Sequence, residues 1–141
     1  MKKFEFSLQK VLDYRLTVEE QAKAKFAEVQ RQINETEQLI VDLGHEKHDM
    51  MDVRELSLGR LQVQHRYLAQ LDNEIMMANA HLRQLDGEQQ KTLNAYVEAQ
   101  RERKVLEKLR DKKKAEYQLE ANHEEQKQLD EMANRPKYSL D

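Results

Sequence analysis

The chain has 141 residues, of which 36% are charged and 6% aromatic, with no cysteine, no tryptophan, one proline and three glycines. Without cysteine there are no disulfides and no thiolate metal sites, and 38% hydrophobic residues are too few for a thick globular core. The net charge of −3 disfavours nucleic acid as the main partner. Glutamine, glutamate, leucine, lysine, alanine and arginine are abundant, and these residues favour helices.

Neither a secretory signal nor a membrane span is expected. Lys2 and Lys3 lead directly into Phe4-Glu5-Phe6 without an apolar stretch. Apolar runs such as Leu39-Ile40-Val41 are far shorter than the roughly 20 residues that a membrane span needs. The expected location is the cytoplasm, with no direct insertion into the membrane.

A first helix is predicted over about residues 7–50. Ser7 is a favourable N-cap residue, and Phe6 and Val11 are spaced for a hydrophobic staple. Apolar residues then recur in alternating steps of four and three, which indicates the seam of a left-handed coiled coil rather than disorder. The predicted seam contains Ala22, Phe26, Val29, Ile33, Thr36, Ile40 and Leu43.

A turn is predicted at about residues 51–60, with or without one short helical turn inside it. Asp52 and Glu55 have the spacing of a capping box, and Ser57 is a second candidate for the start of the next helix.

A second helix is predicted over about residues 61–134. Pro136 should end this helix near Asn134, and residues 135–141 should form a tail. Its apolar stripe contains Leu61, Leu68, Leu71, Ile75, Ala78, Leu82 and Leu85. Gln89 and Leu93 then give two successive steps of four, which is the pattern of a coiled-coil stutter. Gly87 weakens the helix beside it, and both a bend and a straight, softened helix fit this pattern.

The expected fold is therefore all-α: an antiparallel two-helix coiled-coil hairpin forming one domain over residues 1–141, with a longer second helix. The two helices would be roughly 65 and 110 Å long. About thirty residues of the second helix, near 104–134, should project beyond the first. This projection carries an apolar set that would need a partner, comprising Val105, Leu106, Leu109, Tyr117, Leu119, Leu129 and Met132.

No catalytic or metal site is predicted, and no cofactor. The His45-Glu46-Lys47-His48 segment places its histidines three residues apart, whereas a zinc-protease motif needs a spacing of four. A solvated pair of histidines is the favoured interpretation. An enzyme is not expected, because the sequence has no phosphate-binding loop, nucleophile elbow or calcium loop.

The segment from Arg101 to Tyr117 is basic, with eight positive and four negative residues. It is either a solvated helix face with internal ion pairs or a surface that binds an acidic protein. Nucleic acid is disfavoured because acidic residues are interleaved. The second interpretation makes Arg103, Lys104, Leu106, Leu109, Lys112, Lys113 and Lys114 candidate partner-binding residues.

Tyr67, Leu71, Glu74 and Ala78 follow one face of the second helix in steps of four, three and four. Leu71 and Ala78 belong to the predicted seam, so Tyr67 should lie at its edge. A partly exposed aromatic ring in this position is a candidate contact for a partner protein.

The opening pattern Phe4-x-Phe6-x-Leu8-x-x-Val11-Leu12-x-x-Arg15, followed by a long coiled coil, resembles the FliJ family of flagellar export proteins. The resemblance covers essentially the whole chain. It implies an antiparallel two-helix protein of the bacterial cytoplasm, peripherally associated with the inner face of the membrane. Such a protein resembles the stalk of rotary ATP synthases, and its partners would be the ring of the export ATPase, the export gate in the membrane and export chaperones.

Carried onto this chain, the resemblance implies that Leu8, Val11, Leu12 and the basic projection enter the ATPase ring. It assigns Tyr67 and Leu71, with Ala78 beyond them, to the export gate, although Glu74 departs from the expected pattern. Two alternatives stay open, namely a scaffold coiled coil that forms homodimers and the stalk of a virulence-type secretion system. The expected oligomeric state is a monomer or a weak homodimer.

Overall fold

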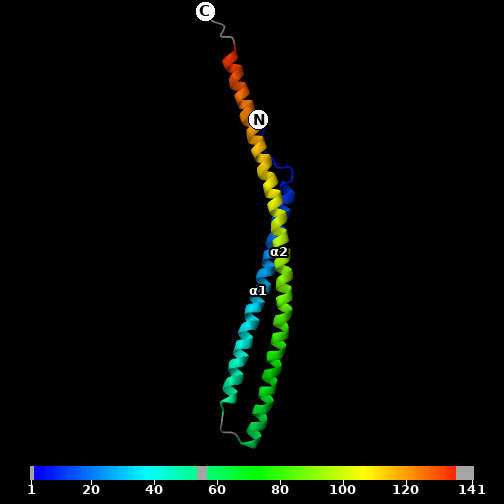
Figure 1. The fold of residues 1–141 in the computed structure, drawn as a ribbon, viewed down its shortest axis with the longest axis vertical. Helices are drawn as coiled ribbons and strands as arrows, with labels where there is room; N and C mark the ends of the chain where they lie inside the picture. Colours follow the sequence, from blue (N-terminus) through cyan, green and yellow to red (C-terminus); the bar gives the residue numbers. More distant parts are fainter. Residues whose placement is uncertain (1, 54–56, 136–141) are drawn as a thin grey trace, which may run out of the picture. The chain divides into compact units, whose positions relative to one another are not determined.

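The computed structural model describes residues 2–53 and 57–135 and consists of two long helices packed against each other (Figure 1). Helix α1 spans Gln9–Met51 and has 43 residues, whereas helix α2 spans Leu58–Asn134 and has 77. The described residues contain no strand. The predicted all-α hairpin with a longer second helix is confirmed.

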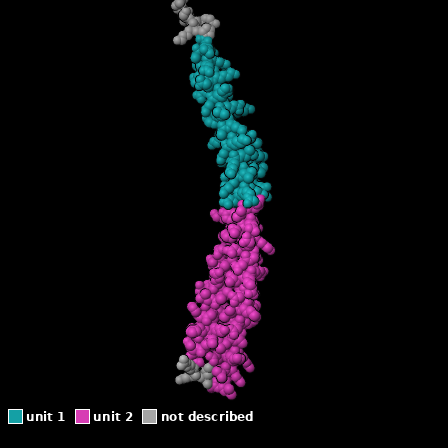
Figure 2. Space-filling model, in the orientation of Figure 1, with its two compact units in different colours: residues 1–19, 99–141 teal, residues 20–98 magenta. Residues whose placement is uncertain are grey.

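The chain divides into two compact units (Figure 2), each of which contains part of α1 and part of α2. Unit 1 contains residues 1–19 and 99–141, and unit 2 contains residues 20–98. Each unit is described separately below.

In unit 2, the residues that the heptad pattern selects are buried or half-buried, except Leu61, which is 50% exposed at the start of α2. Val29, Ile33 and Leu85 form one core cluster, against which the half-buried Leu82 packs. Other buried residues of this seam are Thr36, Leu43, Leu71 and Ala78. The alternation of four and three keeps one side of each helix facing the other, so a chain with few apolar residues can still bury a narrow core.

Thr36 is the buried polar residue of this core, with 8% of its surface exposed. Its Oγ1 donates a hydrogen bond of 2.8 Å to the carbonyl of Gln32 in the preceding turn of α1. The hydroxyl therefore enters the seam without losing a hydrogen-bonding partner.

The stutter predicted at Gln89 and Leu93 is absent from α2. Thr92 is half-buried in the seam, whereas Leu93 is 37% exposed. The threonine hydroxyl donates to the carbonyl of Glu88 at 2.9 Å, which satisfies it within its own helix. Gln89 donates to the side-chain oxygen of Gln30 across the hairpin. The buried positions of α2 thus continue in alternating steps of four and three. The packing of the whole helix keeps this register, although it leaves Leu93 partly exposed.

Ser57 is the N-cap residue of α2. The N–H of Arg60 donates to Ser57 Oγ at 3.3 Å, and the N–H of Leu61 donates to the Ser57 carbonyl at 2.8 Å. These bonds satisfy donors that the first turn of a helix otherwise leaves free. The alternative start signal from Asp52 and Glu55 lies partly outside the described residues.

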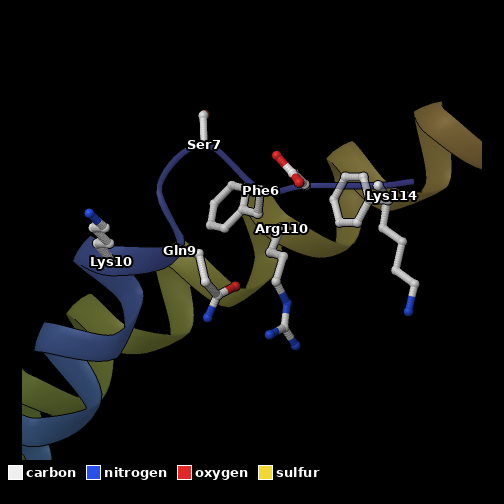
Figure 3. Close-up of a pocket in the computed structure, with 8 residues that line it drawn as sticks. Phe6, Ser7, Gln9, Lys10, Arg110 and Lys114 are labelled. Atoms are coloured by element: carbon white, nitrogen blue, oxygen red, sulfur yellow. The ribbon is translucent and has the colours of Figure 1, made fainter. Parts of the chain in front are cut away.

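Ser7 does not cap α1, so that prediction was wrong. The N–H of Gln9 donates to the carbonyl of Phe6 at 3.0 Å, which makes Ser7 and Leu8 part of a turn. The carbonyl of Leu8 accepts the first helical hydrogen bond, from Leu12, at 2.9 Å. The Ser7 side chain points away from both helices (Figure 3). Phe6 is half-buried, and the turn at Ser7 and Leu8 places its ring against α2.

Candidate protein-binding surfaces

Residues 2–6, here called the arm, are non-helical and lie against α2 within unit 1. The ring of Phe4 packs on the ring of Tyr117 with centroids 5.5 Å apart and an interplanar angle of 51°. The Tyr117 hydroxyl donates a hydrogen bond to the carbonyl of Lys2. Tilted aromatic pairs of this kind stabilise beyond the area that they bury. The arm therefore extends the covered part of α2 as far as Tyr117.

This coverage shortens the projection predicted at 104–134. A non-helical chain advances about 3.3 Å per residue, against about 1.5 Å in a helix, so a few residues of arm cover several turns of α2. Leu106, Leu109 and Tyr117 are half-buried, and Tyr117 is covered by Phe4 of the arm. The uncovered part of α2 begins after Tyr117.

The uncovered end of α2 is polar on the side that would continue the seam. Steps of three and four from Tyr117 lead to charged residues, namely Glu120, Glu124, Lys127 and Glu131. The exposed apolar residues Leu119, Leu129 and Met132 are spread over about 140° of the helix circumference. This arc is less than half of the circumference and lies outside the seam positions, so the three apolar residues share one exposed side of the helix that does not continue the seam.

The basic residues of α2 separate onto different faces. Successive helical residues point about 100° apart, so Lys112, Lys113 and Lys114 face three directions. Lys104, Lys108 and Lys112 instead follow one another in steps of four on the side of α2 turned away from the seam, and all three are exposed. None of them forms an ion pair with another residue in the described part of the chain. We call these three residues the lysine stripe.

Arg103 belongs to the seam rather than to a free surface. Its Nε donates to Glu19 at 2.6 Å, its Nη2 donates to the same carboxylate at 3.1 Å, and its Nη1 reaches Glu107 at 2.8 Å. The side chains of Arg103 and Glu19 are 18% and 15% exposed. Hydrogen bonds to the two carboxylates raise the pKa of Arg103. The hydrogen-bonding groups of the Arg103 guanidinium are therefore bound to carboxylates of this chain rather than available to a partner protein.

The other candidate residues divide between buried and exposed positions. Leu12, Leu71 and Ala78 are 1%, 2% and 7% exposed, so in the intact hairpin they support the surface rather than form it. Leu8 and Val11 are exposed at the start of α1. Lys113 is exposed and lies 3.6 Å from Glu116.

Tyr67 lies at the edge of the seam in unit 2, as predicted, and it is half-buried. Its hydroxyl donates a hydrogen bond to the carboxylate of Glu46 on α1. This bond, with the nearby charge of Glu74, raises the pKa of Tyr67 above its ordinary value of 10.0. Phenolate formation would place a negative charge beside the carboxylate of Glu46.

A pH titration tests this contact. The folded-state pKa of Tyr67 is the raised one, so the contact contributes stability below the unfolded-state pKa and loses it as the pH rises through the folded-state pKa. Ultraviolet absorbance should show that Tyr67 ionises at a pH above its ordinary pKa of 10.0. Glu46→Gln should bring that step down towards the ordinary range, whereas Glu37→Gln, an exposed change elsewhere on α1, should not. An unchanged titration in Glu46→Gln would contradict the assignment.

The described residues contain no group of three or more histidine, aspartate or glutamate side chains placed to hold a metal ion. His48 lies 3.6 Å from Asp52, which directly follows the end of α1, and both side chains are exposed. Neither described helix is long and apolar enough to cross a membrane.

Comparison with protein-family models finds one description that fits nearly the whole chain: "Flagellar FliJ protein" matches residues 4–137. The chain belongs to the FliJ family. It is thus a protein of flagellar export. Searches of curated proteins and of solved structures give no match.

Within unit 1, the residues that carry the FliJ resemblance hold the arm and the start of α1 against α2. Phe4 packs on Tyr117, and Leu12 is among the most buried side chains of the chain. Arg15 forms an ion pair with Glu102 on α2. The opening pattern of this FliJ family member therefore encodes how its arm and the start of α1 lie on α2.

Proposed function

We propose that this protein is a non-enzymatic, stalk-like component of the flagellar export apparatus that binds the ring of the export ATPase through the lysine stripe. One observation carries the proposal: Lys104, Lys108 and Lys112 are exposed, lie on one face, and have no carboxylate partner among the described residues. Val105 beside them is 61% exposed and adds apolar surface. Exposed cations in a row favour fast association with an acidic surface.

Electrostatic docking of this kind suits a partner that binds reversibly. Arg103 is excluded from the docking surface because Glu19 and Glu107 occupy it. Leu8 and Val11 are exposed at the start of α1 and are proposed to make apolar contacts with the same ring.

Contact with the export gate is proposed for Tyr67, whose ring is partly exposed in unit 2. Leu71 and Ala78, one and three turns further along α2, are buried in the seam and support the helix surface there. Export chaperones are a further class of partner in this proposal. The protein would act in the cytoplasm, at the inner face of the membrane, as a monomer or weak homodimer.

The scaffold alternative, a coiled coil that forms homodimers through the end of α2, is disfavoured. A coiled-coil dimer needs apolar residues at the seam positions, and beyond Tyr117 these are Glu120, Glu124, Lys127 and Glu131. Placing like charges opposite one another in a second copy would be unfavourable. The FliJ match likewise favours the flagellar system over a virulence-type one.

A binding experiment tests the proposal. The purified chain, immobilised through its C-terminal end, should retain the export ATPase of the same bacterium, and the retained amount should fall as the salt concentration rises. Recovery of neither the ATPase nor a gate component would refute the proposed role. Binding that does not depend on salt would refute the electrostatic mechanism.

A further inference from the structure

We propose that the hollow between the arm and α2 binds an acidic, extended segment of a protein partner. This hollow belongs to unit 1 and lies on a different side of α2 from the lysine stripe. The inference concerns other residues than the lysine stripe, and Gln9 and Lys10 of the hollow lie between Leu8 and Val11, which are proposed to contact the ring.

Figure 3 shows how the hollow is built. The arm passes over α2, turns at Ser7 and enters α1, which places the ring of Phe6 beside Arg110. Lys114 follows Arg110 by one turn of α2. The hollow is open to solvent, has a volume of about 890 Å³, and is lined by Phe4, Glu5, Phe6, Ser7, Gln9, Lys10, Arg110 and Lys114.

The charge of this lining is unbalanced. Lys10, Arg110 and Lys114 contribute three positive charges, and Glu5 is the one acidic residue that lines the hollow. None of the three cations forms an ion pair or a side-chain hydrogen bond with another described residue. Their charged ends point in different directions around the hollow (Figure 3), so the three unpaired cations are suited to an extended ligand that carries several carboxylates.

A comparison of Arg110 with Arg103 sharpens this point. The two residues are seven apart, so they occupy the same face of α2. Arg103 is satisfied by Glu19 of α1 and by Glu107. Seven residues back along α1 from Glu19, the corresponding residue is Leu12, which has no carboxylate to offer. Arg110 thus lies on the same face of α2 as Arg103. The guanidinium of Arg103 binds the Glu19 carboxylate through two hydrogen bonds, whereas that of Arg110 has no such partner.

The hollow also offers apolar surface, which a small inorganic anion would not use. The half-buried Phe4 and Phe6 supply aromatic surface beside the cations. One peptide could place a carboxylate on Arg110 and a neighbouring apolar side chain against the ring of Phe6. An adjoining hollow contains Lys2, Lys3 and Lys113 but also Glu116 and Glu120, and this acidic rim disfavours a nucleic-acid backbone.

The arm itself favours an extended ligand. Among the described residues, the N–H groups of the arm donate no backbone hydrogen bond, whereas its carbonyls accept one from the Tyr117 hydroxyl at Lys2 and one from the N–H of Gln9 at Phe6. A non-helical segment with free N–H groups can pair with an extended peptide laid alongside it.

The test uses the full chain and a short fluorescein-labelled peptide of glutamates with one central phenylalanine, followed by fluorescence anisotropy. The hollow variant combines Lys10→Gln, Arg110→Gln and Lys114→Gln. The control variant, with the same loss of charge on exposed residues of unit 2, combines Lys23→Gln, Arg83→Gln and Lys91→Gln. The hollow variant should bind the peptide about tenfold more weakly or worse, whereas the control should bind within about twofold of the wild type.

Circular dichroism of both variants verifies that the helices are intact. Equal weakening in the two variants would overturn the proposal, because it would mean that only overall charge matters. Equal binding of a matched glutamine peptide, or tighter binding of a single-stranded oligonucleotide, would overturn it as well. Retention of the export ATPase is measured in parallel, so that failure of the hollow is distinguished from failure of the proposed ring docking.

Discussion

Replacing Ile33 by aspartate is expected to unfold unit 2 under conditions in which the wild type is folded. Ile33 is 5% exposed and packs in one cluster with Val29 and Leu85. The substitution removes apolar contacts and places a carboxylate in the seam without a partner. We expect a loss of about 4 kcal/mol or more in the free energy of unfolding.

Val41→Asp is the matched control, because it introduces the same charge on the exposed side of α1, where Val41 is 48% exposed. Thermal unfolding followed by circular dichroism should show a change within about 1 kcal/mol for this variant. If the two variants lose stability equally, the seam described for unit 2 is not what holds α1 to α2.

Reversing the lysine stripe is expected to weaken binding to the export ATPase by about two orders of magnitude at low salt. The variant combines Lys104→Glu, Lys108→Glu and Lys112→Glu, and it turns attraction to an acidic surface into repulsion. All three side chains are exposed and unpaired within the described residues, so the helices should be unaffected. A binding titration at two salt concentrations measures the effect.

The control for this prediction reverses three exposed cations of unit 2, in the combination Lys23→Glu, Arg83→Glu and Lys91→Glu. The total change in charge is the same, so a change in overall charge alone would weaken both proteins alike. We expect the control to bind close to the wild-type level. Comparable losses in the two variants would show that the position of the stripe is irrelevant.

The helices and the core of unit 2 could be predicted from sequence because their cause is periodic. A coiled-coil seam repeats the same requirement every three or four residues, so Val29, Ile33 and Leu43 identify one another without knowledge of the opposite helix. The N-cap at Ser57 was also recognisable, since its hydrogen bonds involve only neighbouring residues.

The features of unit 1 were harder to predict because they depend on contacts between distant parts of the chain. The sequence gives no local sign that Arg103 pairs with Glu19, which is 84 residues away. In the same way, Phe4 of the arm packs on Tyr117, and a turn closed by Gln9 and Phe6 stands where the N-cap at Ser7 was predicted. The lysines were recognised as a group, but their division between stripe and hollow required the helix geometry and the position of the arm.

The proposed role in export is tested most directly by measuring the flagellar proteins that a bacterium releases into its culture medium. A strain lacking this chain should release little flagellin, and the wild-type chain should restore it. The variant with the reversed lysine stripe should accumulate as a folded protein and yet fail to restore release. Full restoration by that variant, or undiminished release from the strain lacking the chain, would contradict the proposed function.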